Sequence, residues 1–279
     1  MRTLVCHNPG RERHTEPLNA FAEGLRSRGH EVEEIYSTSF LEYSAENFDM
    51  VVIFGSGNIH KGFNGKLKHT IMAVCEEFVK PFVMLEEAYV KRGEYWAVGI
   101  DGLAGAGLYT YPEMDQNRID KITTYKPFEW SGRNILLCKQ IEADVNVGIP
   151  PRKYRKWLDD IGLRLADLGY PVVVREHPRV KKNTPPIAEA LKNSRFLVTY
   201  SSTSAVDAAL VGVPFYVEAK HHALYSLGMH DLEEFNGMVP THDDQRRALN
   251  DMANGQWTEN EMISGQCWDH FEHVLEFWR

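Results

Sequence analysis

Two clusters of polar side chains follow apolar runs in the second half of the chain. Arg175 and His177 come directly after the run 172–174, in the spelling R-E-H-P. The second cluster follows the run 196–198 and consists of four consecutive hydroxyl residues, Ser201, Ser202, Thr203 and Ser204. Proteins bind phosphate with such cationic side chains and with the N–H groups at the start of a helix. The pattern predicts an anion site, and no Walker or G-x-G-x-x-G spelling supports a P-loop or NAD-binding protein.

Two acids lie close to these clusters. Asp207 comes one turn into the helix expected at 205–210, and Glu218 follows the apolar run 214–217. Either carboxylate could accept hydrogen bonds from the ribose hydroxyls of a nucleotide. The alternatives are structural, because an acid in the first turn complements the helix dipole and hydroxyl residues cap helix starts.

Candidate catalytic bases lie in the first half. Glu86 follows the apolar run 82–85, where a strand is expected to end, and a carboxylate there could deprotonate a hydroxyl group. Asp101 and His7 are the alternative bases. Glu86 and its neighbour Glu87 could instead be solvated loop acids. Because side chains alternate along a strand, we expect Glu86 and Glu87 to point in opposite directions.

Small and aromatic residues near these acids could bind an acceptor. Gly55 and Gly57 follow the apolar run 50–54 and would let a ligand approach the backbone. The other candidates share an aromatic ring or a positive charge and are Tyr89, Arg92, Tyr95 and Trp96. The alternative is that the aromatic rings fill the core.

The elements that position these residues alternate between strand and helix in both halves. Such alternation is typical of parallel βαβ sheets, whose ligands bind beyond the carboxyl ends of the strands. We expect one domain at 1–130 and a second at 131–279, with 111–133 as the linker. The glycine-rich segment 99–107 is expected to be a loop, and the segments 243–253 and 259–278 are expected to be helices. The tail aromatics Trp257, Trp268, Phe271 and Trp278 should pack these helices onto the two domains.

Composition narrows the class of protein. The net charge is −8, which gives no overall attraction to nucleic acid or to an anionic membrane. No apolar run reaches the length of about 20 residues that a membrane span needs. The four cysteines are widely spaced without a C-x-x-C pair, so we expect buried thiols and no metal site. These features predict a cytoplasmic protein.

The two halves together resemble the GT-B glycosyltransferases, an α/β fold in which two Rossmann-like domains with parallel sheets face each other across a cleft. The R-x-H-P turn and the S-S-T-S helix start look like the carboxyl-terminal half of bacterial sialyl- and Kdo-type transferases and capsule enzymes. In those families the His-Pro turn and a serine pair contact the donor nucleotide and its phosphate. The resemblance implies this role for His177, Ser201 and Ser202.

A longer resemblance is to phage-encoded GT-B-like proteins of DNA modification. It rests on L-E-x-[AG]-Y at 85–89, G-x-[DN]-G-L at 99–103, R-x-H-P at 175–178, an approximate S-x-[ST]-x-V-D at 201–207, and Q-W-T-x-x-E-[IM]-x-x-G-x-x-W at 256–268. The chain has Asp101 and Ala104 where asparagines are expected in the glycine loop. That departure favours Glu86 over Asp101 as the base.

These resemblances imply an enzyme that moves a sugar from a UDP- or CMP-linked donor to an acceptor hydroxyl, without a tightly bound cofactor. The first acceptor they imply is a hydroxymethylated pyrimidine in phage DNA. The alternatives are a polysaccharide or lipopolysaccharide acceptor with a CMP-sugar donor, and a catalytically silent nucleotide-binding module. A DNA acceptor predicts one surface patch of five cations, Lys61, Lys66, Lys68, Lys91 and Arg92. The net charge of −8 favours a small or neutral acceptor.

Overall fold

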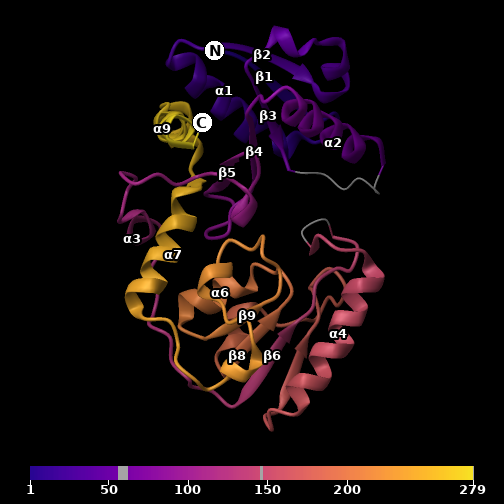
Figure 1. The fold of residues 1–279 in the computed structure, drawn as a ribbon, viewed down its shortest axis with the longest axis vertical. Coiled ribbons are helices and arrows are strands. Elements are labelled where there is room, and N and C mark those ends of the chain that lie inside the picture. The colour runs from indigo at the N-terminus through magenta and orange to yellow at the C-terminus, as the bar shows by residue number, and fades with distance from the viewer. Residues whose placement is uncertain (56–61, 145–146, 279) are drawn as a thin grey trace. The chain divides into compact units, whose positions relative to one another are not determined.

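The alternating apolar runs of the sequence form two separate sheets, each in its own α/β unit. The computed structural model describes residues 1–55, 62–144 and 147–278. Unit 1 comprises Met1–Arg118 and Asp251–Arg279, and unit 2 comprises Ile119–Asn250. The chain passes between the units within α3 (Arg118–Ile122) and again within α7 (His242–Asn254). Figure 1 shows the fold and labels most of its helices and strands.

The sheet of unit 1 has the strand order β10-β5-β4-β3-β1-β2. Its strands are β1 (Arg2–His7), β2 (Glu31–Tyr36), β3 (Met50–Phe54), β4 (Phe82–Glu87), β5 (Trp96–Ile100) and β10 (Gln256–Trp257). The first four run parallel, whereas β5 is antiparallel to β4 and β10 is antiparallel to β5. Every residue of β3 is buried, as expected for a central strand that is covered on both faces.

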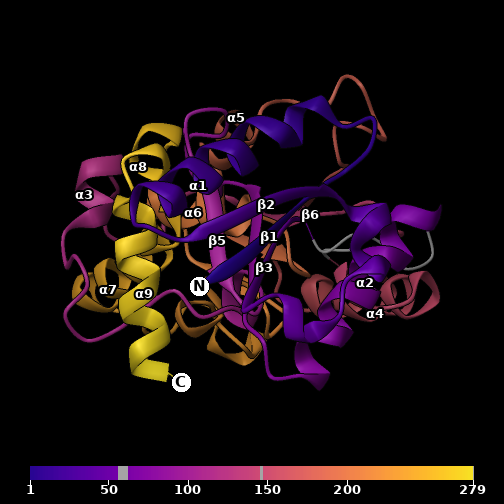
Figure 2. The same cartoon turned by 90° about the horizontal axis from the view of Figure 1, so that it is seen from above.

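Helices cover both faces of this sheet. On one face lie α1 (Thr15–Ser27), α8 (Glu259–Ile263) and α9 (Gln266–Trp278), and their core contains Phe21, Trp268 and Phe271. On the other face α2 (Gly62–Glu77) contributes Leu67 and Ile71 to a second core. Figure 2 shows α8 and α9 on the same side as α1, with α2 opposite. The helices alternate with the strands as the βαβ pattern predicts.

The sheet of unit 2 is parallel throughout and has the order β7-β6-β8-β9. Its strands are β6 (Asn134–Cys138), β7 (Val172–Arg175), β8 (Ser194–Thr199) and β9 (Phe215–Val217). Its helices are α4 (Pro151–Ala166), α5 (Ile187–Leu191) and α6 (Ser204–Val211). The apolar side of α4, with Ile161 and Leu165, packs against Ile135 and Phe196 of the sheet. The predicted βαβ series is therefore present here too.

Short 3-10 helices complete the connections of both units. They are η1 (Glu12–His14), η2 (Ser37–Glu42), η3 (Ala45–Asn47), η4 (Ala104–Ala106), η6 (Tyr225–Leu227) and η7 (Leu232–Glu234).

The glycine-rich segment was predicted as a loop, and part of that prediction is wrong. Residues 96–100 form strand β5, which pairs with β4 over Trp96–Ile100. Glycine is needed inside this strand because a Cβ atom at Gly99 would lie 2.3 Å from the carbonyl oxygen of Gly102. The spacing of these glycines therefore reflects close backbone packing of the segment that follows the strand.

The C-terminal segment does not belong to the second unit, so the predicted division into 1–130 and 131–279 differs from the observed one. Strand β10 extends the sheet of unit 1, and α8 and α9 pack beside α1. Trp257, Trp268 and Phe271 lie in that core, as expected for tail aromatics, whereas Trp278 is 52% exposed. The buried guanidinium of Arg118 strengthens the attachment, since it lies 3.8 Å from the ring centre of Trp257 and pairs with Glu261 at 3.0 Å.

All four cysteines are buried, in agreement with their apolar surroundings in the sequence. Burial raises the pKa of the Cys138 thiol to about 11. Within the described residues, no helix combines the length and the apolar character that crossing a membrane would require.

Two helical glycines provide a matched test of this packing. A Cβ atom at Gly24 of α1 would lie 2.0 Å from the carbonyl oxygen of Met262, whereas one at Gly162 of α4 would meet nothing within 4 Å. Gly24→Ala should lower the free energy of unfolding by about 3 kcal/mol through overpacking. Gly162→Ala should raise it by about 0.5–1 kcal/mol, because alanine restricts the unfolded chain. Urea unfolding measures both, and equal small effects would contradict the close contact between α1 and α8.

Candidate functional site

The parallel strands of unit 2 end at one level, so the residues after them share an edge. Arg175 at the end of β7 is in register with Cys138 of β6, which is in register with Thr199 of β8. The polar residues that follow β6, β8 and β9 are Gln140, Ser201 and Glu218. The two predicted clusters therefore lie at the carboxyl edge, where ligands of such sheets bind.

Gln140 connects the ends of two adjacent strands. Its Oε1 atom accepts a hydrogen bond from the backbone N–H of Ser201 at 2.9 Å, and its Nε2 atom donates to the Ser201 hydroxyl at 3.0 Å. The backbone N–H of Gln140 donates to the hydroxyl of Tyr154, a buried residue of α4, at 2.8 Å. Sequence reasoning missed Gln140 as a site residue, although it follows a strand just as the predicted residues do.

The hydroxyl residues after Ser201 form the turn into α6. The Ser202 hydroxyl accepts a hydrogen bond from the N–H of Ser204 at 3.2 Å. Thr203 occupies the N-cap position, but its side chain makes no capping hydrogen bond. The simple explanation that each hydroxyl caps the helix therefore does not hold for Thr203. The helix ends at Gly212, whose φ of +80° is the left-handed conformation typical of a helix end.

The Arg175 guanidinium is the main cationic group at this edge. Its Nη2 atom donates to the carbonyl oxygen of Pro185 at 3.0 Å. Its Nε atom is buried and has no hydrogen-bond partner among the described residues. Arg175 is paired with Cys138, the last residue of β6, in the parallel sheet. Arg175, Ser204 and Asp207 all influence the pKa of the Cys138 thiol.

His177 and Glu218 are held by their own neighbours. The Nδ1 atom of His177 accepts a hydrogen bond from the backbone N–H of Arg179 at 3.1 Å. The Oε2 atom of Glu218 accepts hydrogen bonds from Trp157 at 3.0 Å and from the Tyr216 hydroxyl. Burial, together with the bond to Glu218, raises the pKa of the Tyr216 phenol. Glu218 is thus engaged in the interior of unit 2 toward α4.

The carboxyl edge of unit 1 carries the predicted base. Glu86 Oε1 accepts a hydrogen bond from the backbone N–H of Glu87 at 3.1 Å, and Glu86 Oε2 lies 2.8 Å from where a Cβ atom of Gly55 would be. Gly55 has a φ of +67°, so both its conformation and its contact with Glu86 require glycine. Glu87 forms an ion pair with Arg13 at 2.5 Å. The two acids therefore have different partners, as predicted from strand alternation.

A buried lysine accompanies Glu86. Lys68 of α2 is 8% exposed, and its Nζ atom donates to the carbonyl oxygen of Phe54 at the end of β3. Desolvation lowers the pKa of Lys68, and attraction to Glu86 opposes this effect. His14 stacks on the Phe54 ring with centroids 4.1 Å apart. Desolvation, reinforced by Lys68 and nearby arginines, lowers the pKa of His14 to about 4.

The alternative bases lie apart from Glu86. Asp101 follows antiparallel β5 and accepts a hydrogen bond from the N–H of Phe82, the first residue of β4, at 3.0 Å. It is therefore at the opposite end of β4 from Glu86. His7 ends β1 at the carboxyl edge, but its Nε2 atom is 2.9 Å from Glu34 of the edge strand β2.

The predicted acceptor residues are mostly structural. Trp96 is 6% exposed, lies in the main core of unit 1 and donates to Glu259 at 3.1 Å, so the alternative that the aromatic rings fill the core holds for this residue. The backbone N–H of Tyr89 donates to the Gln256 side chain at 2.9 Å, and burial raises the pKa of the Tyr89 phenol. Arg92 is exposed and donates to the carbonyl oxygen of Ala88 at 3.0 Å, and Tyr95 is partly buried.

The predicted patch of five cations does not form as a surface feature. Lys68 is buried on α2, whereas Lys66 and Lys91 are exposed, and Lys91 lies 3.7 Å from Glu94. Lys61 and Gly57 fall outside the described residues. Within the described residues, no cluster of three or more histidine, cysteine or acidic side chains could hold a metal ion.

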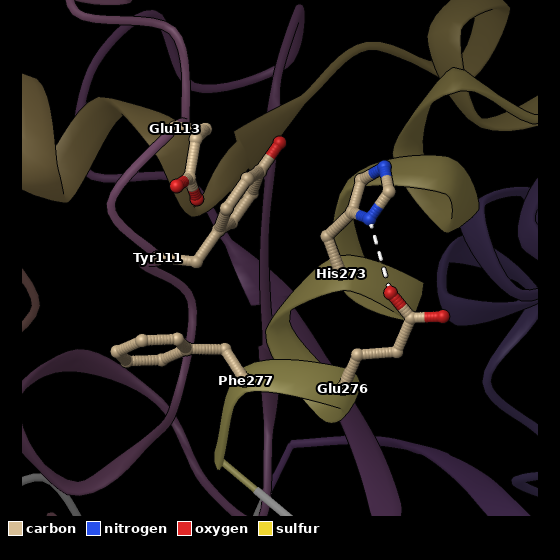
Figure 3. Close-up of a pocket in the computed structure, with 5 residues that line it drawn as sticks. All are labelled: Tyr111, Glu113, His273, Glu276 and Phe277. Carbon is tan, nitrogen blue, oxygen red and sulfur yellow. Dashed lines mark hydrogen bonds and ion pairs between the residues drawn. The ribbon is translucent and has the colours of Figure 1, made fainter.

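A surface pocket of unit 1 lies apart from these residues. It is lined by Tyr111, Glu113, His273, Glu276 and Phe277. Figure 3 shows the Tyr111 ring beside Glu113, and His273 Nδ1 lies 3.3 Å from the Glu276 carboxylate. Desolvation and the nearby Glu113 raise the pKa of the Tyr111 phenol. The residues predicted from the sequence are not among those that line this pocket.

Two solved structures share the fold. The Thermosulfurimonas dismutans KpsC β-Kdo 2,4 transferase aligns with 94% of this chain and 98% of its own, with a TM-score of 0.56 and 13% identity. The KpsC β-Kdo 2,7 transferase of the same organism aligns with 96% of this chain and 99% of its own, with a TM-score of 0.52 and 11% identity. No family model and no curated protein matches the sequence. The likeness confirms the predicted fold class, two Rossmann-like α/β units of the GT-B type.

Two buried histidines make stability depend on pH. Burial lowers the pKa values of His222 in unit 2 and His270 in unit 1 to about 4. Between pH 4 and 6.5 the unfolded chain therefore binds more protons than the folded chain, so the free energy of unfolding falls as the pH is lowered. Each histidine contributes up to about 3 kcal/mol to this loss.

Replacing one histidine should remove its share of the effect. Urea unfolding at several pH values between 7 and 4 should show a shallower pH dependence for His270→Phe than for the unchanged protein. Carboxylates that titrate in the same range are common to both proteins and cancel in the comparison. If the free energy of unfolding depended on pH equally in both proteins, His270 would not be a neutral, buried group in the folded protein.

Proposed function

We propose that the protein is a glycosyltransferase that binds the nucleotide part of a sugar donor at the carboxyl edge of unit 2. The observation that carries this proposal is the Nε atom of Arg175, which is buried without a hydrogen-bond partner among the described residues. A buried donor left unsatisfied costs about 1–3 kcal/mol, and a bound phosphate would recover that energy. The fold shared with two β-Kdo transferases supports the same class of reaction.

The donor would be held by groups that already lie at this edge. In the proposal, Arg175 and His177 stabilise the negative charge of the departing phosphate, and Ser201 and Ser202 hold its oxygens. Asp207, in the first turn of α6, is the remaining candidate for the ribose hydroxyls. Glu218 is a weaker candidate because Trp157 and Tyr216 already donate to its Oε2 atom.

The acceptor hydroxyl requires a base, and Glu86 is the proposed one. Its carboxylate lies at the carboxyl end of β4, against Gly55 and near the buried Lys68, where an acceptor hydroxyl could reach it. The proton would pass from the acceptor hydroxyl to Glu86, the hydroxyl oxygen would form the new glycosidic bond, and the phosphate of the donor would leave with the electron pair of the broken bond. Asp101 is not needed for this step.

A saccharide acceptor is better supported than DNA. The basic path proposed for a DNA backbone includes Lys68, which is buried, and the stacking platform includes Trp96, which lies in the core. The two structural neighbours transfer Kdo, a sugar, according to their names. We therefore propose transfer to a poly- or oligosaccharide, from a CMP- or UDP-linked donor.

Mass spectrometry of paired acceptors tests this function. The protein is incubated with pooled CMP- and UDP-sugars and with either bacterial oligosaccharides or a hydroxymethylated DNA duplex. The proposal predicts a mass increase of one sugar on an oligosaccharide. Transfer only to DNA would overturn the saccharide acceptor. Donor binding without transfer or donor hydrolysis would identify a silent nucleotide-binding module instead.

If Arg175 binds the donor phosphate, removing its guanidinium group should weaken nucleotide binding. Arg175→Ala should weaken nucleotide binding about tenfold or more, because a charged hydrogen bond to phosphate is lost. The control is Arg179→Ala, which removes an exposed arginine four residues further along the chain and should change the affinity by less than about threefold. Calorimetry with CMP and UDP measures both. Equal losses in the two variants would indicate a general charge effect rather than a site at Arg175.

If Glu86 is the base, replacing it should reduce turnover without weakening donor binding. Glu86→Gln should reduce kcat by about a hundredfold or more, since an amide of the same shape cannot accept the proton. Glu87→Gln and Asp101→Asn are the matched controls, because one acid pairs with Arg13 and the other lies at the far end of β4. If Glu86→Gln retains full kcat, the proposed base is wrong.

A further inference from the structure

The segment after β9 makes specific contacts with the turn between β8 and α6. The backbone N–H of Ala219 donates to the carbonyl oxygen of Tyr200 at 2.8 Å. Three residues further on, His222 is 5% exposed, and its Nε2 atom lies 3.2 Å from the carbonyl oxygen of Ser202. The serine turn, defined here as residues 201–204, is therefore attached to the strand next to it in the sheet as well as to its own.

The hydrogen bonds of His222 determine its tautomer. The Nδ1 atom accepts from the backbone N–H of Leu224 at 3.1 Å, so this nitrogen carries no proton. The proton must then be on Nε2, which donates it to the carbonyl oxygen of Ser202. Burial favours this neutral ring. Because both ring nitrogens are engaged with backbone groups, His222 is not suited to act as an acid or a base.

The bond from His222 orients a peptide group of the serine turn. In a trans peptide the C=O and N–H groups point in opposite directions. Since the Ser202 carbonyl points to the buried imidazole, the N–H of Thr203 points away from it. On the other side of the turn, Gln140 holds the N–H and the hydroxyl of Ser201. Strand β8 lies between β6 and β9, so Gln140 and His222 hold the turn from both neighbouring strands.

We propose that Gln140 and His222 are positioning residues that hold the serine turn in its phosphate-binding conformation before the donor arrives. This inference rests on the proposed function, in which the turn binds the donor phosphate. A turn that is already ordered loses less conformational entropy when the ligand binds, and this increases the affinity. Neither residue needs to touch the sugar or the reacting atoms for this effect.

Hydrogen exchange tests the positioning without requiring any activity. Amide exchange at residues 201–204 should become at least about tenfold faster in His222→Phe, because the turn opens more often when its attachment is lost. His222→Gln should restore part of the protection, since its amide group can still donate to the Ser202 carbonyl. His270→Phe is the matched control, because His270 is also buried and donates to a backbone carbonyl, that of Tyr109 at 2.8 Å, but in unit 1. It should leave exchange in the serine turn unchanged.

Donor kinetics separate positioning from a general loss of stability. The KM for the donor should rise about tenfold in His222→Phe and less in His222→Gln, with kcat changing less than KM. Gln140→Glu, which keeps an acceptor for the Ser201 N–H but lacks the Nε2 donor, should raise KM as well. Unchanged exchange and unchanged KM in both His222→Phe and Gln140→Glu would overturn the inference.

The same measurements distinguish this inference from the proposed function. If the unchanged protein binds neither CMP nor UDP in calorimetry, the donor assignment fails. Faster exchange in His222→Phe would then still support a held turn, but its role in binding the donor would be refuted. If the unchanged protein binds nucleotide and His222→Phe binds it equally well, the positioning role alone is wrong.

Discussion

The hydrogen bonds between Gln140 and Ser201 are the interaction on which the polar edge of unit 2 depends. Parallel strands that end at the same level leave backbone N–H and C=O groups without ladder partners, and buried groups of this kind need other partners. The Gln140 side chain supplies both a donor and an acceptor to Ser201, while Tyr154 holds Gln140 itself. Packing of α4 on the sheet is thereby linked to the conformation of the turn that opens α6. Beside these hydrogen bonds, Lys139 and Glu176 form an ion pair at 2.7 Å directly after β6 and β7.

In unit 1, charged side chains lie at the carboxyl ends of the strands. At its edge the Phe54 carbonyl is bound by Lys68, and the Glu86 carboxylate lies against Gly55. Burying an ammonium group is costly unless it is paired and hydrogen-bonded, so such an arrangement adds little to stability. The charged groups retained near Glu86 are the reason that this edge is proposed to carry the base.

Local patterns in the sequence predicted the elements, but not the contacts between distant segments. Apolar runs such as those at 50–54 and 196–198 identified the central strands, and Arg175 and Ser201 were found because polar residues follow such runs. Strand β5 was missed because Gly99 indicates a loop when its close packing against Gly102 is unknown. Because β5 runs antiparallel to β4, Asp101 lies at the opposite end of β4 from Glu86. The amphipathic tail was recognised as helical, but its place in unit 1 depends on contacts between distant segments, such as the pairing of β10 with β5 and the close approach of Gly24 to Met262. Gln140 and His222 act through side-chain hydrogen bonds to the backbone and to Ser201, and these leave no periodic signal in the sequence.

The most direct test of the donor site is nuclear magnetic resonance of the full chain titrated with CMP and UDP. Assigned proton–nitrogen correlation spectra would follow the backbone amides of residues 202–204 together with the side-chain Nε–H of Arg175. The account predicts saturable shifts of these signals with one common dissociation constant. It would be contradicted by a nucleotide that binds with these signals unchanged, for instance by shifting only residues around the pocket of Tyr111 and His273 in unit 1.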